Sequence, residues 1–208
     1  GHSHLFSMAV PNLISYDPAF AFEIAVIIEE GIRRMYREGK SVFYYITLMN
    51  ELYEMPPMPE GVREGILKGM YRLRAAEPKQ GQPRAHLLAS GAIVNEALKA
   101  QQMLANQYGV AADVWSVTSY QELYRDGHAA ERWNRLHPGE KPRVPWVTQC
   151  LGDVEGALVA ASDYVKALPD AIDRGLPRRL AVLGTDGFGR SENRAALREF
   201  FEVDARFI

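Results

Sequence analysis

The chain has 208 residues, of which 47% are hydrophobic, and its formal net charge at pH 7 is −2. This composition is typical of a globular protein and is long enough for one large domain, or for one domain and part of another. The near-zero charge offers no basic face for a nucleic acid, and no apolar run approaches the roughly 18 residues that would cross a bilayer.

A single cysteine, Cys150, excludes an intramolecular disulfide and a Cys-x-x-Cys site. The chain opens on "GHSH" and shows no signal-peptide pattern, so we expect a cytoplasmic protein or part of one.

The first quarter of the chain predicts a helix, a strand and a linker. Asp17 and Pro18 are typical of an N-cap followed by the first helical position, and the apolar spacing predicts a helix to about Gly39. The aromatic and β-branched run 41–48 predicts a buried strand. Three prolines in 53–60 predict an extended linker, where we place a domain boundary.

From residue 61 onward, predicted helices alternate with predicted strands. We expect helices at 61–73, 92–108, 120–136 and 191–201, and strands at 85–91, 112–119, 143–151 and 179–185. Residues 153–168 fit a strand or a helix equally well. Strands that alternate with helices predict an α/β fold, with a mostly parallel open sheet flanked by helices.

The stretch "GTDGFGRS", residues 184–191, nearly spells the phosphate loop G-x-x-x-x-G-K-[ST]. Its candidate phosphate-binding residues are Gly184, Gly187, Gly189, Arg190 and Ser191. Arg190 stands where such a loop needs lysine, and the Asp186 carboxylate would repel a phosphate. The pattern therefore favours a tight strand-to-helix turn, with Ser191 as the cap of the last helix.

Other polar residues form weaker patterns. His2 and His4 would point the same way from a strand, which suits a metal or an anion, although a plain loop explains them as well. His128 and Glu131, close to Asp126, could share a helix face, but a solvated helix start is the commoner outcome. Cys150 lies in an apolar run and is expected to be buried.

Several stretches together resemble a known family: "YYITLMNE…MPPMPEG", "VWSVTSYQEL", "RDGHAAERWNRLHPGEKPRVPWV" and "VLGTDGFGRSENRAALREFFEVDA". They are similar to the C-terminal region of the homodimeric bacterial pyruvate dehydrogenase E1 components, which are transketolase-like thiamine diphosphate enzymes. The resemblance covers essentially the whole chain in order, from "GHSH" onward.

The resemblance implies that residues 1–52 end the middle, pyrimidine-binding domain with its last helix and strand. Residues 53–60 would be the linker, and 61–208 a transketolase C-terminal-like domain that is truncated at its C-terminus. The family decarboxylates pyruvate with thiamine diphosphate and Mg²⁺ and transfers the acetyl group to the lipoyl group of the E2 acyltransferase. Within the homodimer, this region would support the subunit interface and the entrance to the active site.

The family's cofactor-binding and catalytic motifs have no counterpart among these residues. The resemblance therefore implies no catalytic, cofactor-binding or metal residue within the chain, which we expect to be inactive alone. His2 and His4 would lie in the wall of the active site. Two alternatives stay open: a non-catalytic α/β assembly domain, and a phosphate-binding domain that uses residues 184–191.

Overall fold

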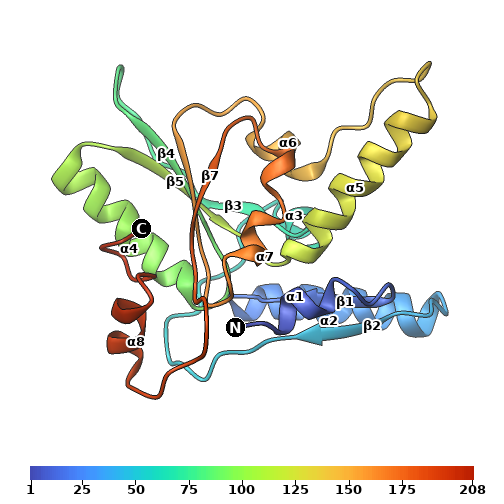
Figure 1. Cartoon of the computed structure of the whole chain (residues 1–208), viewed down its shortest axis with the longest axis horizontal. Coiled ribbons are helices and arrows are strands. Elements are labelled where there is room, and N and C mark those ends of the chain that lie inside the picture. Colours follow the sequence, from blue (N-terminus) through green and yellow to red (C-terminus); the bar gives the residue numbers. More distant parts are fainter.

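The computed structural model describes all residues, 1–208, and arranges them in two units that each contain a β-sheet (Figure 1). The N-terminal unit carries two strands, β1 and β2, and the larger unit carries five, in the order β3-β5-β4-β6-β7. None of the helices is both long and apolar enough to cross a membrane.

The N-terminal unit is a parallel strand pair with its connecting helix. Its elements are α1 (Ser3–Ser7), β1 (Leu13–Tyr16), α2 (Ala21–Ile32), the π-helical turn η1 (Arg33–Arg37) and β2 (Phe43–Ile46). β1 pairs with β2 from Leu13 opposite Phe43 to Tyr16 opposite Ile46. A parallel pair needs a crossover connection, which α2 supplies, and Ile27 on this helix is fully buried in a cluster with β1.

The predicted start of the helix at Asp17 is wrong. Helix α2 begins at Ala21, because the Glu23 carboxylate reaches back and accepts hydrogen bonds from the backbone N–H groups of Ala19 (2.5 Å) and Phe20 (3.1 Å). These groups would otherwise lack partners at the helix end. The Asp17 side chain therefore does not cap this helix.

The strand that the sequence predicted as buried has one exposed face. Phe43 and Tyr45 on β2 are 47% and 37% exposed, and the strand alternates between exposed and partly covered positions. Sequence analysis did not predict β1, whose four residues are too few to show a clear period.

Residues 47–62 contain no helix or strand, as the three prolines predict. The chain then forms α3 (Arg63–Lys68), and the predicted helix 61–73 is only half correct. Gly69 adopts φ +107° and ends α3, a conformation that favours glycine. The chain reverses there into β3 (Tyr71–Arg74), which joins the sheet antiparallel to β5.

The remaining four strands of the larger sheet are parallel: β4 (Arg84–Ala89), β5 (Ala111–Ser116), β6 (Ala157–Ala161) and β7 (Leu180–Leu183). The mostly parallel α/β fold is confirmed. β4 lies centrally between β5 and β6 and is almost entirely buried. Such strands, covered on both faces, are apolar along most of their length.

Helices cover both faces of this sheet (Figure 1). They are α4 (Ile93–Met103) with the π-helical turn η2 (Leu104–Tyr108), α5 (Tyr120–Leu136), α6 (Trp146–Leu151), α7 (Ala167–Asp170) with the 3-10 turn η3 (Asp173–Gly175), and α8 (Arg194–Phe200). α4 and the segment after α8 pack on one face around Leu87 and Val114. α5, α6 and α7 pack on the other around Leu88 and Leu158.

Helix α5 has the bounds that its sequence predicts. The Ser119 hydroxyl accepts a hydrogen bond from the Glu122 backbone N–H at 3.0 Å, which fixes the N-terminus. Helix α4 with η2 likewise ends at Gly109, as predicted, with φ +63°.

Two other predictions are wrong, one about the type of an element and one about a helix cap. The predicted strand 143–151 is the helix α6, which begins directly after Pro145; a proline fits the start of a helix better than a sheet ladder. The last helix, α8, is capped by the side chain of Asn193, which accepts a hydrogen bond from Ala196 N–H at 3.0 Å. Ser191 therefore does not cap it.

We predict that Gly156→Ala destabilises the chain by about 3 kcal/mol or more. Gly156 adopts φ +101° just before β6, and a Cβ atom there would lie 2.1 Å from the Arg84 carbonyl oxygen on β4. Gly139→Ala is the control, since a Cβ atom there meets nothing within 4 Å. Denaturant unfolding should show a change of at most about 0.5 kcal/mol for the control. Equal effects of the two variants would contradict this account.

Candidate functional site

The carboxyl ends of β4, β5 and β6 form the edge where an open α/β sheet ordinarily binds ligands. β4 is followed along the chain by β5 on one side of it and then by β6 on the other, so the strand order reverses next to β4. In this chain the N-terminal unit covers that edge. Asp17 N–H donates to the Thr118 carbonyl after β5 (2.8 Å), and Gly91 N–H after β4 donates to the Asp17 carbonyl (3.0 Å).

The Asp17 side chain is buried at this junction. Its Oδ1 accepts a hydrogen bond from the Thr47 hydroxyl at 2.7 Å, whereas Oδ2 has no partner. Burial raises the pKa of Asp17 to about 7. Gly91 makes room for this carboxylate, because a Cβ atom there would lie 2.7 Å from Oδ2.

His4 joins the same junction from helix α1. Its Nε2 lies 2.9 Å from the Thr47 hydroxyl oxygen, and its ring meets the edge of Tyr164 at 4.6 Å between ring centres. Burial lowers the pKa of His4 to about 4, so the ring is neutral at pH 7. His2 is exposed and stacks on Phe6. The two histidines thus differ in their surroundings, because they lie at the start of a helix and not on a strand.

Glu23 forms the second buried polar contact between the units. Besides the two backbone N–H groups before α2, its carboxylate accepts hydrogen bonds from the hydroxyl groups of Tyr71 on β3 (2.7 Å) and Ser116 on β5 (2.6 Å). Burial raises the pKa of Glu23. We refer to the contacts of Asp17, His4, Thr47 and Glu23 as the buried polar seam.

The glycine turn 184–191 lies after β7, beside the start of the chain. Gly184 is packed so closely that a Cβ atom would lie 2.5 Å from the Tyr164 carbonyl oxygen, and Gly187 adopts φ +81°. Asp186 accepts a hydrogen bond from Lys166 N–H at 3.0 Å, which ties the turn to the segment after β6. Ser191 is exposed.

A cavity of about 280 Å³ opens between this turn, Gly1, the segment after β2 (Met49 and Glu51) and α8. Of the five phosphate-loop candidates, Gly187, Gly189 and Arg190 line it, whereas Gly184 and Ser191 do not. Arg194 and Arg198 of α8 also line it, and sequence analysis did not single them out.

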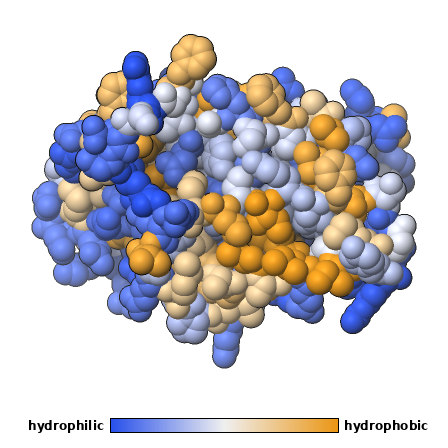
Figure 2. All heavy atoms as spheres, turned by 90° about the horizontal axis from the view of Figure 1, so that it is seen from below, coloured by the Kyte–Doolittle hydropathy of each residue, from blue (hydrophilic) through white to orange (hydrophobic).

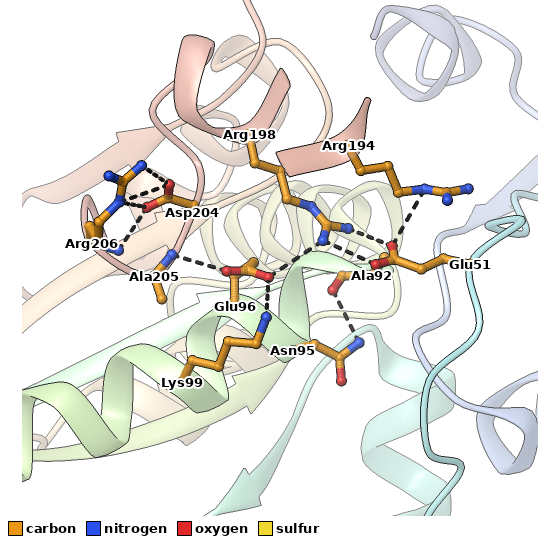
Figure 3. Close-up of polar contacts among 10 residues, drawn as sticks. All are labelled: Glu51, Ala92, Asn95, Glu96, Lys99, Arg194, Arg198, Asp204, Ala205 and Arg206. Atoms are coloured by element: carbon orange, nitrogen blue, oxygen red, sulfur yellow. Dashed lines mark hydrogen bonds and ion pairs between the residues drawn. The ribbon is translucent and has the colours of Figure 1, made fainter. Parts of the chain in front are cut away.

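Arg198 binds two carboxylates at once, which joins α8 to the segment after β2 and to α4 (Figure 3). Its guanidinium donates to both carboxylate oxygens of Glu51, at 3.1 and 2.6 Å, and to Glu96 Oε1 at 3.4 Å. Glu96 also accepts from Lys99 Nζ at 2.7 Å and from Ala205 N–H at 3.2 Å. Bidentate arginine–carboxylate pairs of this kind are among the stronger charged contacts in proteins.

The remaining candidates do not gather into a catalytic cluster. His128 and Glu131 face a groove beside α5, 3.8 Å apart between Nδ1 and Oε2, while Asp126 accepts a hydrogen bond from Trp146 N–H. Cys150 is half-buried on helix α6, and burial raises the pKa of its thiol to about 11. No group of three His, Cys, Asp or Glu side chains could hold a metal ion.

Two family models match this chain. The transketolase-like C-terminal domain matches residues 69–204, and the pyruvate dehydrogenase E1 component middle domain matches residues 1–56. The chain belongs to the pyruvate dehydrogenase E1 family. The family suggested by the sequence motifs is thus confirmed.

The chain is similar along its whole length to several pyruvate dehydrogenase E1 components. It is 51% identical to that of Pseudomonas aeruginosa, 53% to that of Haemophilus influenzae and 50% to that of Escherichia coli K12. All of this chain is covered in each case, but only 24%, 24% and 23% of those proteins. The chain therefore spans about a quarter of the length of these E1 components.

Solved transketolases share the fold. A Pichia stipitis transketolase mutant superposes with a TM-score of 0.66 at 15% identity, over 99% of this chain and 25% of that one. A split-gene transketolase superposes with a TM-score of 0.60 at 18% identity, over 99% of this chain and 58% of that one. At these identities the likeness establishes the fold alone.

We predict that Asp17→Asn flattens the pH dependence of stability between about pH 4 and pH 7. The unfolded chain loses the Asp17 proton near pH 4, whereas the folded chain keeps it until about pH 7. The folded state is therefore disfavoured progressively as pH rises through this range, by up to about 4 kcal/mol at about 1.4 kcal/mol per pH unit.

The measurement is the free energy of unfolding at pH 5 and pH 8 for both forms. The amide of the Asp17→Asn variant does not ionise and carries no such penalty, so the variant should gain stability relative to the parent chain at pH 8. The exposed Asp170→Asn serves as the control and should keep the parent's pH dependence. If the free energy of unfolding of Asp17→Asn changed with pH as much as that of the parent chain, the raised pKa of Asp17 would be contradicted.

Proposed function

We propose that this chain is the C-terminal part of a thiamine diphosphate-dependent pyruvate dehydrogenase E1 component. The complete enzyme would decarboxylate pyruvate and transfer the acetyl group to the lipoyl group of the E2 acyltransferase, in the cytoplasm. The observation that supports this most directly is about 50% identity to E1 components over every residue of the chain. Identity at this level without gaps in coverage is expected of proteins with the same role.

The residues present do not fit a binding site for the cofactor's diphosphate and Mg²⁺. The acidic, histidine and cysteine side chains form no cluster of metal ligands, and the one loop that resembles a phosphate loop lacks its lysine. We therefore place thiamine diphosphate and Mg²⁺ on parts of the enzyme outside these residues. The chain alone would be inactive.

We propose the domain division at the proline-rich segment. Residues 1–52 would complete the middle domain, 53–60 would form the linker, and 61–208 would form the transketolase-like C-terminal domain. Two observations support this division: the two sheets do not pair with each other, and one family model ends at residue 56 while the other begins at residue 69.

The role of this part would be to support the homodimer and the entrance to the active site. The lower face of the molecule, on the side of the N-terminal unit, carries a hydrophobic patch (Figure 2). The N-terminal unit and the segment after β2 leave several large apolar side chains exposed, among them Phe6, Ile28, Ile32, Tyr36, Phe43 and Leu48. Apolar patches of this kind mark surfaces that another protein part covers, here the rest of the enzyme and its second subunit.

His2, whose side chain is exposed, would belong to the wall of the active site. His4 would act from behind that wall through its contact with Thr47, since it is buried. The same exposed face is also compatible with a second function, a non-catalytic assembly domain. Turnover measurements separate the two.

We predict that the chain alone shows no heat of binding when it is titrated with thiamine diphosphate and Mg²⁺ in a calorimeter. When the N-terminal part of a close relative is added, pyruvate turnover and acetyl transfer to a lipoyl acceptor should appear. The control is that N-terminal part without this chain, which should remain inactive. One-to-one cofactor binding by the chain alone would contradict the assignment of the cofactor site, and failure of every reconstituted mixture would favour the assembly domain.

A further inference from the structure

The cavity beside the glycine turn carries more arginine than its carboxylates neutralise. It is lined by Arg190, Arg194 and Arg198, and by Gly187 and Gly189 of the turn. We propose that this cavity binds a phosphate group, as free phosphate or as a small phosphate ester, through Arg190, Arg194 and the backbone of the turn. This proposal does not depend on the enzymatic function proposed above.

The arginines in the cavity wall differ in how far carboxylates neutralise them. Arg198 is fully engaged, because its guanidinium holds Glu51 in a bidentate pair and also contacts Glu96. Glu51 is thereby neutralised, and its nearest contact to Arg194 is long, at 3.8 Å. Arg194 also donates to the Asn50 carbonyl oxygen, a neutral acceptor that leaves its charge in place. Figure 3 shows the Arg194 guanidinium extending away from Glu96, past Glu51.

Arg190 forms no salt bridge. Its guanidinium lies over the Phe200 ring, with Cζ 5.4 Å from the ring centre, which holds the side chain in place and leaves its N–H donors free. A guanidinium in this state suits a phosphate, because its planar set of donors matches two oxygen atoms at once.

The backbone of the turn adds further donors. The N–H groups of residues 187–190 donate no hydrogen bond within the chain. A Cβ atom added to Gly187 or Gly189 would meet nothing within 4 Å, so the space beside the backbone is open. Successive free N–H groups in a turn with positive φ are a common way to hold an anion.

A carboxyl group in the wall of the cavity limits which ligands fit. Asp163 lines the cavity, and burial raises the pKa of its carboxyl group. A hydroxyl group on the ligand would pair with this side chain, whereas a second anionic group would be repelled. The cavity volume of about 280 Å³ lies at the small end of ligand pockets, which span roughly 300–1,000 Å³. This favours a small hydroxylated phosphate ester over a nucleotide.

The test is a calorimetric titration of the full-length protein, saturated with thiamine diphosphate and Mg²⁺ so that any cofactor site is filled. The probes are inorganic phosphate and glycerol phosphate, each compared with chloride at equal ionic strength. The variants are Arg190→Ala, which removes only the contact with Phe200 and should fold, and Arg174→Ala as a matched control on an exposed arginine outside the cavity. Thermal unfolding without ligand verifies that each variant is folded.

We expect one saturable site per chain, binding at least ten-fold more weakly in Arg190→Ala and unchanged in Arg174→Ala. Tighter binding of glycerol phosphate than of phosphate would assign the site to an ester, and equal affinity would assign it to free phosphate. Absence of saturable binding to the parent protein, or equal affinity of Arg190→Ala and parent, would overturn the proposal. Neither of these results bears on pyruvate turnover, so failure here is distinct from failure of the proposed enzymatic function.

Discussion

The Glu23 carboxylate is the contact on which the arrangement of the two units depends most. It is fully buried and accepts four hydrogen bonds, two from the backbone before α2 and two from the hydroxyl groups of Tyr71 and Ser116 in the larger sheet. Buried carboxylates are costly unless each oxygen is paired, and this one has all four of its donors only when both units are in place. With α2 fixed in this way, β1 brings Asp17 to the carboxyl ends of β4 and β5. The edge where such sheets bind ligands is then closed by the chain itself, which agrees with a part that supports a site built elsewhere.

Much of the fold is predictable because its signals are local. Helix α5 has a serine cap and a regular apolar period, so both of its bounds follow from sequence. The prolines of the linker exclude regular structure there without any tertiary information. The failures come where tertiary contacts decide. Glu23 sets the start of α2 from inside the helix. Gly69 ends α3 because the chain turns there in close contact with the Ser119 carbonyl oxygen. The run at 143–151 is apolar enough for a strand, but Pro145 opens a helix that packs against the core beside α5.

The candidate sites were predictable to a smaller extent. The glycine turn stands out in the sequence, and part of it does line a cavity. The arginines that complete this wall come from α8, where Arg194 and Arg198 look like ordinary residues of a solvated helix face. The spacing of His2 and His4 suggests a pair, yet the short helix α1 leaves one ring exposed and the other buried. The contacts of Glu23 with the larger sheet could not be predicted from the sequence, since Tyr71 and Ser116 lie 48 and 93 residues away along the chain. The sequence motifs identified the family where these local patterns did not identify a site.

The most direct test of the central role of the buried polar seam is hydrogen exchange of the backbone amides in the Glu23→Ala variant. This change leaves four donors without a partner, and we expect protection of β1 and α2 to fall about 10- to 100-fold, equivalent to about 1.5–3 kcal/mol. Protection of β1 and α2 should fall less in Glu23→Gln, because the glutamine amide oxygen still accepts hydrogen bonds from the backbone and its NH₂ group donates to a hydroxyl. Unchanged protection of β1 and α2 in Glu23→Ala would contradict the view that this carboxylate holds the two units together.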